Sequence, residues 1–476
     1  MSRRLVSVAV AVLAATTAVP LRAQRPTLTT AVRSFVSVDS AIVALTHVRV
    51  IDGTGAPARV DQTVVIRDGA IAALGDSRSV PIPAGAQVLD LTGKSVIPGL
   101  VMVHEHLFYP TGPGIYGNLA ESFTRLYLAG GVTSMRTGGN MNGFTDIGIK
   151  HDIDAGRKPG PWIDATGPYL EGRGLGLDQV HELTGPDDAR RMVNFWADEG
   201  ATSFKAYMHV SRAELGAAIE EAHKRGLKVT GHLCSVTFRE AASLGIDNLE
   251  HAFFVATDFV TDKKPDECPG QAVGQAAVAG VDPESEAVRT LITDLVRQHV
   301  ALTSTLTVFE TFVPGRPLPP GLDMLEPELR TQFEQRHATN ANNTRSPYPA
   351  LYAKATALEL AFVRAGGLLI AGTDPTGFGG VIPGYANERA LELLVESGFT
   401  PLEAIKIGTL NGASFLGRSG KVGSVALGKQ ADLVVVSGDP SARIADVRNV
   451  EIVFKQGVGY DSAKLRESVR GKVGLY

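Results

Sequence analysis

The chain has 476 residues, of which 44% are hydrophobic, 20% are charged and 6% are aromatic, and its formal net charge is −4. These values are typical of a globular protein with a sizeable core, and they exclude a disordered or collagen-like chain. There is no basic excess that would indicate nucleic acid as a partner. The length fits one large domain with an appendage as well as three small domains.

Residues 1–23 have the pattern of a cleavable secretory signal peptide. Arg3 and Arg4 precede an apolar run that begins at Leu5, and Leu21-Arg22-Ala23 ends the segment before a polar stretch. The apolar run is shorter than the ~20 residues that a membrane helix needs, and a single-pass anchor is the alternative interpretation of this segment. We therefore expect an exported protein, periplasmic or secreted, without membrane contact after cleavage; the leader leaves Sec and twin-arginine export open.

The only two cysteines are Cys234 and Cys268. So few cysteines exclude a small disulfide-stapled fold and a cysteine-rich zinc site. Export would place the chain in an oxidising compartment, where one disulfide and two unpaired thiols are both compatible with the sequence.

Two segments near the ends of the chain have the pattern of small β-sheets. Asp52-Gly53 and Asp68-Gly69 are turn signals between apolar runs. The runs lie at 44–51, 63–66, 70–74, 423–425, 431–436 and 450–455. We predict that residues 41–95 and 421–476 form one composite β-sandwich domain, and that residues 24–40, which lack a clear period, are a tether.

Residues 96–420 alternate short apolar runs with amphipathic helical stretches, which is the pattern of β/α units around a parallel sheet. The clearest unit has a strand at 202–207 and a helix that begins with Ser211 and Glu214 at the spacing of a capping box. The fold class predicted for this segment is α/β, as a (β/α)8 TIM barrel.

Polar side chains collect at the ends of the predicted barrel strands. His104 and His106 are two residues apart, so a strand presents both imidazoles on one face to a metal ion. Four more such residues are Lys205, His232, His251 and Asp374. Because barrel enzymes build their sites at the carboxyl ends of the strands, we predict that all six lie close together.

Lys205 is a cation inside an apolar strand, where an unpaired ammonium would be costly. Burial lowers the pKa of such an amine and makes it reactive. Lys205 is therefore a candidate to take up carbon dioxide as a carbamate that bridges two metals, with a salt bridge to Asp374 as the alternative.

Taken together, the pattern resembles the amidohydrolase superfamily, in particular its prolidase-like and imidazolonepropionase-like members with a binuclear metal centre. The resemblance covers nearly the whole chain after the leader. The matching motifs include Pro98-Gly99-Leu100 before His104-Glu105-His106, Gly131-Val132-Thr133 with Arg136, Phe204-Lys205-Ala206-Tyr207, Gly231-His232, Glu250-His251 and Gly372-Thr373-Asp374. The chain departs at Thr137, where many relatives carry an aspartate.

The resemblance implies two divalent metal ions, with His104, His106 and Asp374 as ligands of one. It implies that His232 and His251 hold the other ion and that carbamylated Lys205 bridges the pair. Asp374 would also be catalytic, shuttling the proton of a hydroxide that the two ions activate. Histidine and carboxylate ligands favour Zn²⁺ and leave manganese, cobalt and iron open.

Three further residues are candidates for contact with substrate. Tyr207 shares a strand face with Lys205 and is predicted to be catalytic and substrate-binding, as a donor to the developing oxyanion, with packing as the alternative. His181 follows a predicted strand at 162–167 and is predicted in the same two roles, with an exposed loop position as the alternative. Arg136 is predicted to bind a substrate carboxylate.

The predicted function is hydrolysis of an amide or peptide bond in a small substrate, an N-acyl amino acid or dipeptide. Hydrolysis of a lactone, an ester or a cyclic amide at the same site is the first alternative, because loop changes alone can redirect such a fold. A non-catalytic metal-binding protein is the second. We expect a small-molecule partner, no nucleic acid and no membrane; a homo-oligomer is expected only by analogy with relatives.

Overall fold

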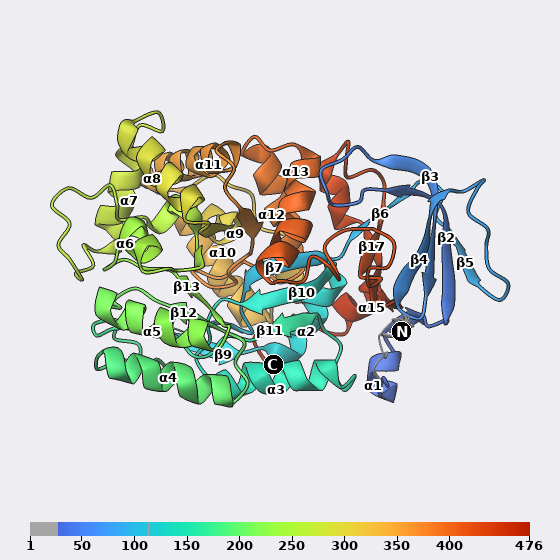
Figure 1. Ribbon diagram of the computed structural model, residues 1–476, viewed down its shortest axis with the longest axis horizontal. Helices are drawn as coiled ribbons and strands as arrows, with labels where there is room; N and C mark the ends of the chain where they lie inside the picture. Colours follow the sequence, from blue (N-terminus) through green and yellow to red (C-terminus); the bar gives the residue numbers. More distant parts are fainter. Residues whose placement is uncertain (1–26, 113) are drawn as a thin grey trace, which may run out of the picture.

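The computed structural model describes residues 27–112 and 114–476, so the predicted leader at 1–23 lies outside the described residues. Figure 1 shows an elongated molecule with a large β-sheet at one end and a helix-rich body at the other. In the described ranges, no helix has the length and apolar character to cross a bilayer.

Eight parallel strands form the centre of the helix-rich body. They are β7 (Leu100–Glu105), β10 (Val132–Thr137), β11 (Trp162–Asp164), β12 (Ser203–Ala206), β13 (Lys228–Gly231), β14 (Asn248–Leu249), β15 (Ala301–Ser304) and β16 (Leu369–Ala371). They form two parallel sheets, ordered β11-β10-β7 and β12-β13-β14-β15-β16. A bridge between Thr166 and Ser203 joins the sheets at one edge, and Thr373 N donates to His104 O at the other, over 3.1 Å. The α/β class is confirmed, and the strand order is the one expected of a barrel.

Helices that follow the strands cover the outside of this ring. They include α2 (Ala120–Ala129), α3 (Gly143–Asp154), α4 (Pro186–Asp198), α5 (Arg212–Lys224), α6 (Phe238–Ser243), α8 (Glu286–Arg297), α11 (Tyr348–Arg364) and α12 (Tyr385–Glu396). The predicted capping box begins α5: Glu214 N donates to Ser211 Oγ, and Ser211 N donates to the Glu214 carboxylate. Leu215 and Ile219 lie on its buried face, as the helical period predicts.

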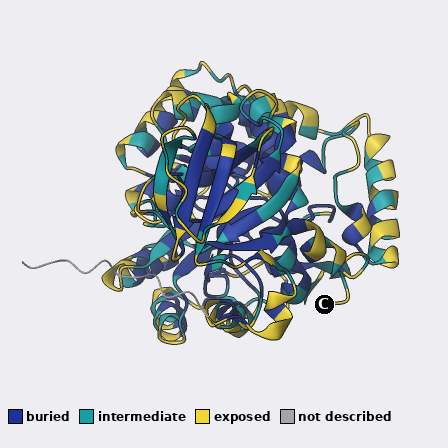
Figure 2. Ribbon diagram, turned by 90° about the vertical axis from the view of Figure 1, so that its right-hand side faces the viewer, coloured by how far each residue is buried: buried dark blue, intermediate teal, exposed yellow. Residues whose placement is uncertain are grey.

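The terminal segments combine into one nine-stranded sheet. Its strands are β1 (Val36–Val38), β2 (Ile42–Val50), β3 (Arg59–Arg67), β4 (Ala70–Asp76), β5 (Gln87–Asp90), β6 (Lys94–Pro98), β17 (Leu433–Ser437), β18 (Val450–Lys455) and β19 (Val458–Asp461). Antiparallel pairing of β6 with β17 joins the two segments. Figure 2 views this end of the molecule and shows that many of the strands are buried. Because the strands form one continuous sheet, the two facing layers of the predicted sandwich are not confirmed.

The segment predicted as a tether carries structure in its described part. Residues Thr30–Arg33 form the short helix α1, and β1 pairs with β19. Val32 and Val38 are 1% and 2% exposed, so these apolar side chains anchor the segment to the fold. Elements this short contain too few residues to show a period.

Two features shape the open end of the strand ring. A hairpin of β8 (Phe108–Gly112) and β9 (Ile115–Asn118) follows β7, and a long segment between β15 and β16 contains α9 (Leu306–Glu310) and α10 (Pro327–Ala341). Cys234 and Cys268 form a disulfide, one of the two alternatives that the sequence left open. The remaining α-helices of the described ranges are α7 (Gln271–Gly280), α13 (Pro401–Lys406), α14 (Gly412–Phe415) and α15 (Ser462–Glu467).

Candidate metal centre

The six predicted ligands meet at the carboxyl ends of the parallel strands. They are His104 in β7, His106 just beyond it, Lys205 in β12, His232 after β13, His251 after β14 and Asp374 after β16. All six are buried, with residue exposures of 9% or less. Parallel strands direct their carboxyl ends to one side, and this is why residues 270 positions apart in the chain become neighbours.

Two histidines and a carboxylate form the tightest group. His104, His106 and Asp374 each offer a ligand atom, and these atoms lie within 4.8 Å of one another. Asp374 Oδ1 is 3.2 Å from His106 Nε2 and 3.7 Å from His104 Nε2. His106 Nδ1 lies 3.0 Å from the Gly139 carbonyl, which it can meet only as a donor, so its Nε2 keeps the lone pair.

The other three side chains adjoin this group. The rings of His232 and His251 are 4.6 Å apart, and the His251 ring is 4.6 Å from that of His104. Lys205 Nζ lies 3.3 Å from His104 Nε2, and His251 Nδ1 lies 3.7 Å from Asp374 Oδ2. The structure therefore brings all the predicted ligands into one cluster.

Backbone geometry fixes two of these side chains. His251 has φ 63° and Asp374 has φ 54°, a left-handed conformation that non-glycine residues adopt infrequently. Thr373 N and Asp374 N both donate to the His104 carbonyl over 3.1 Å, and the Thr373 hydroxyl donates to the Glu105 carboxylate. The central residue of the His-Glu-His motif thus holds the turn that carries Asp374.

The ionisation of the cluster suits a metal ion. Burial lowers the pKa of His106 to about 4 and that of His232 to about 3, and it lowers the pKa of His251 well below its usual value. Burial alone would raise the pKa of Asp374, but His104 and the other histidines outweigh it and hold this pKa well below the ordinary range. The imidazoles of His106, His232 and His251 are therefore neutral and the Asp374 carboxylate is charged, which are the forms that bind metals. For His104, burial lowers the pKa, but the Glu250 carboxylate outweighs it and raises this pKa above its usual value.

A divalent cation fits this set of donors. His232 Nδ1 is buried without a hydrogen-bond partner, and a buried polar atom of this kind calls for a ligand or ion. Burial lowers the pKa of Lys205 to about 8, so much of this amine is neutral in mildly alkaline solution. Nitrogen and carboxylate donors in a buried cluster are typical of zinc-type sites.

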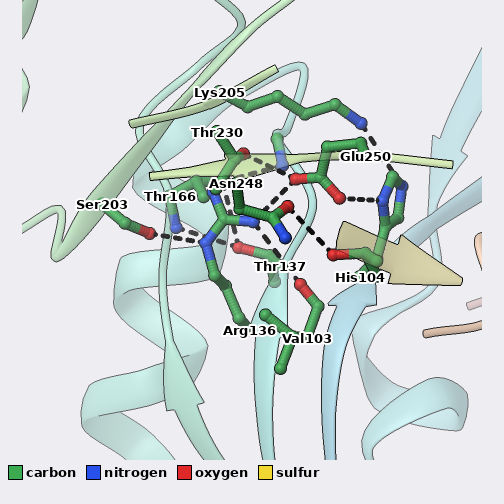
Figure 3. Close-up of polar contacts among 12 residues, drawn as sticks. Val103, His104, Arg136, Thr137, Thr166, Ser203, Lys205, Thr230, Asn248 and Glu250 are labelled. Carbon is green, nitrogen blue, oxygen red and sulfur yellow. Dashed lines mark hydrogen bonds and ion pairs between the residues drawn. The ribbon is translucent and has the colours of Figure 1, made fainter. Parts of the chain in front are cut away.

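A buried ion-pair network lies directly against the cluster (Figure 3). The Glu250 carboxylate pairs with His104 Nδ1 and, over 3.1 Å, with Arg136 Nη1. Arg136 is 1% exposed and also donates to Ser203 Oγ and Thr230 Oγ1. The guanidinium thus faces the protein interior, and the predicted contact between Arg136 and a substrate carboxylate is not supported.

The cluster opens into a cleft of ≈540 Å³ with an aromatic lining. The lining includes Phe108, Tyr116, Tyr169, Tyr207, Phe309 and Phe312. Tyr207 lies where the sequence predicts, with its ring 5.0 Å from that of His232. His181 does not line the cleft: its side chain is 43% exposed, and its Nε2 lies 2.9 Å from Asp188 Oδ2. The predicted substrate contact of His181 is therefore not supported.

Glu250 and Tyr169 lie beside the cluster, but the sequence analysis assigned no role to either residue. Glu250 follows the buried strand Asn248–Leu249, and a charged residue in such a place signals a buried partner. Lys205 Nζ lies 5.5 Å from the centre of the Tyr169 ring, but nothing local in the sequence distinguishes this tyrosine.

Sequence comparison matches parts of this chain to known proteins. The model of the amidohydrolase family matches residues 338–459. An imidazolonepropionase from Nocardia farcinica is 39% identical over 79 residues, which are 16% of this chain and 18% of that protein. A D-hydantoinase from Streptomyces coelicolor is 29% identical over 150 residues, 30% of this chain and 29% of that protein. These matches thus span less than a third of the curated relatives.

Structural similarity extends over most of the chain. A provisionally named prolidase from Bifidobacterium longum is 25% identical, with a TM-score of 0.65 over 90% of this chain and 98% of that one. A Xaa-Pro dipeptidase with methionine bound in its active site is 19% identical, with a TM-score of 0.66 over 88% of this chain and 100% of that one. Together the family match and these structures confirm the resemblance to the amidohydrolase superfamily that the sequence motifs indicate.

Proposed function

We propose that this protein is a metal-dependent hydrolase that cleaves an amide or peptide bond in a small substrate, an N-acyl amino acid or a dipeptide. The observation that carries the proposal is the convergence of four histidines, Lys205 and Asp374 at the base of one aromatic cleft. The similarity to a prolidase and a dipeptidase over the whole fold favours amide bonds over esters.

Divalent metal ions in such a cluster supply a nucleophile at neutral pH and polarise the scissile carbonyl. Asp374 is ionised and borders the cleft, so its carboxylate can accept a proton and deliver it to the leaving nitrogen. Burial raises the pKa of Tyr207, which keeps the phenol protonated as a donor to the substrate carbonyl. The aromatic walls exclude water and hold the apolar parts of the substrate.

Lys205 is proposed to act as a carbamate. Its neutral amine adds to the carbon of carbon dioxide, the nitrogen loses a proton to solvent, and the product is an anion with two ligand oxygens. The amine lies 3.3 Å from His104 Nε2, among the other proposed ligands. This carbamate would bridge two metal ions, for which Zn²⁺ is the proposed identity.

Metal content per chain tests the centre directly. Protein purified without chelator should contain about two metal ions, and Lys205→Ala and Lys205→Met should contain clearly fewer. Lys455→Met is a matched control, because burial also lowers the Lys455 pKa to about 8 while its Nζ donates to the Gly160 carbonyl. Isotopically labelled bicarbonate should give a carbamate signal that Lys205→Met removes. Unchanged metal content in both Lys205 variants would refute the bridge.

Turnover tests the reaction. A panel of N-acyl amino acids, dipeptides, cyclic amides, lactones and esters should be assayed with the metal-loaded protein. Highest kcat/KM on linear amides is the expected result. Preference for a lactone, ester or cyclic amide would select the first alternative, and stoichiometric metal without any turnover would select a metal-binding protein.

We also propose that the chain is exported, because its leader pattern and its disulfide both suit an oxidising compartment. Cell fractionation with a full-length tagged chain tests this, and retention of an uncleaved chain in the cytosol would contradict it. We propose in addition that the chain divides into a composite terminal domain and a barrel domain. We also propose that it assembles as a homo-oligomer.

A further inference from the structure

A second cavity of ≈950 Å³ adjoins the catalytic cleft; we call it the outer vestibule. The two cavities share Gly114 and Tyr116 from the β8–β9 hairpin, and Gly377 and Phe378 from the loop after β16. The same loop carries Asp374, so the boundary between the cavities is directly linked to the cluster of proposed metal ligands. A ligand that leaves the cleft past Tyr116 and Phe378 enters the outer vestibule.

One face of α10 forms the far wall of the outer vestibule. The lining residues are Gln332, Gln335, Arg336, Thr339, Asn340 and Asn343, whose three- and four-residue spacing puts them on one side of the helix and the turn that follows it. The other lining residues are Pro110, Gly112 and the four shared with the cleft. No carboxylate lines this cavity among the described residues, so it offers amides, two hydroxyls (Tyr116 and Thr339) and one cation.

Arg336 is the cation, and no carboxylate of the described residues neutralises its charge. Its side chain donates from Nη1 to the Phe378 carbonyl over 3.4 Å, and no carboxylate forms an ion pair with it in the described ranges. Glu334 on the same helix instead accepts from Arg330 over 2.8 Å. The guanidinium therefore retains donors for a ligand at the point where the two cavities join.

We propose that the outer vestibule is a second binding subsite, in which Arg336 binds a carboxylate at the far end of an elongated substrate. Guanidinium and carboxylate match as paired donors and acceptors, and the neighbouring amides can bind polar groups between the carboxylate and the scissile bond. This inference rests on the proposed function, since it names the class of substrate: an amide whose distal end carries an anion.

The test uses matched substrates that differ only in the distal group. N-acyl amino acids are made with a carboxylate or a neutral carboxamide at the end of a chain of increasing length, placed on the acyl side in one series and on the amine side in the other. The parent should prefer the carboxylate at one chain length. Arg336→Met should raise KM for that substrate about tenfold, with kcat and the carboxamide substrate unchanged, because a charge-assisted contact is lost.

Two controls separate a specific contact from a general effect. Arg330→Met removes an arginine from the same helix outside the outer vestibule and should change neither substrate. Arg336→Lys should recover part of the preference, and added salt should weaken the preference in the parent. Equal KM values for both tails at every length, or the same loss in Arg330→Met, would overturn the proposal.

A binding measurement keeps this inference separable from the proposed activity. Ketomethylene analogues with the same two tails cannot be hydrolysed, and calorimetry should show tighter binding of the carboxylate form in the parent and equal binding in Arg336→Met. If no amide is hydrolysed but this difference persists, the proposed reaction fails and the subsite stands. If amides are hydrolysed without the difference, the subsite fails alone.

Discussion

Replacement of Arg136 distinguishes a structural role from the substrate-binding role that the sequence suggested. In the structure its guanidinium contacts Glu250 Oε1 at 3.1 Å, Thr230 Oγ1 at 2.9 Å and the Phe204 carbonyl at 3.1 Å, all within the ring of parallel strands. Arg136→Met keeps much of the volume and removes every one of these donors. The change should therefore act on stability and not on substrate affinity.

The magnitude follows from what the substitution leaves behind. Removing one partner of a buried ion pair costs about 3–5 kcal/mol, because the other charge stays buried. His104 and Lys205 still face Glu250, so the cost should lie near the lower end, while loss of the hydrogen bond from Arg136 to the Phe204 carbonyl adds about 1 kcal/mol. The total free energy of unfolding of a folded protein is about 5–15 kcal/mol. We expect Arg136→Met to lose about 4 kcal/mol of unfolding free energy.

Chemical denaturation monitored by circular dichroism measures this loss. Arg190→Met is the matched control, because Arg190 is an exposed partner of Asp187 and should change stability by less than about 0.5 kcal/mol. Glu250→Gln should cost several kcal/mol too, and the double variant should lose less than the sum by about 1 kcal/mol or more, since both changes break the same pair.

One result would refute this reasoning about Arg136. If Arg136→Met unfolds at the denaturant concentration of the parent and raises KM selectively for substrates with a carboxylate, the guanidinium reaches the substrate. The buried arrangement would then not be the one in the active protein.

Three other changes test the site and the fold. Asp374→Asn should lower kcat by about 10²–10⁴-fold while part of the metal content remains, because it removes a proton acceptor and only one ligand; a loss of metal affinity alone would favour a binding protein. Tyr207→Phe should lower kcat by about 10²-fold with metal content unchanged, and an unchanged kcat would assign Tyr207 to packing. Burial raises the pKa of Glu359 to about 8 from an ordinary value of 4.5, so the stability that the parent has at low pH should fall as pH rises through about 8. Glu359→Gln should flatten this dependence of the denaturation midpoint on pH. If the slope of midpoint against pH stays the same in Glu359→Gln, the raised pKa of Glu359 is not its cause.

The location of the candidate ligands could be predicted because it depends on topology alone. Each of His232, His251 and Asp374 follows a short apolar run, and parallel strands bring such positions to one end of the ring whatever the details of packing. The capping box of α5 could also be predicted from the sequence, because Ser211 and Glu214 contact each other within one turn.

Side-chain depth and distant partners could not be predicted in the same way. Arg136 belongs to β10, and the alternation of a strand gives the face on which a residue lies but not its distance from the open end. His181 lies in the loop before α4, and its partner Asp188 lies in the first turn of that helix; the sequence does not show that this pair turns away from the cleft. The outer vestibule combines the hairpin, α10 and the loop after β16, whose approach depends on packing.

The network around Glu250 links the stability of the strand ring to the orientation of His104, a proposed metal ligand. Burial opposes the charge of Glu250, but His104, Lys205 and Arg136 outweigh it and hold the Glu250 pKa well below its usual value. The resulting anion accepts the Nδ1 proton of His104, and His104 Nε2 faces Asp374 and Lys205. An Arg136→Met chain that still folds should therefore also bind metal more weakly, although Arg136 touches neither metal nor substrate. Unfolding free energy and metal affinity should fall together in this variant, whereas Asp374→Asn should lower kcat and metal affinity and leave the unfolding free energy of the metal-free protein unchanged.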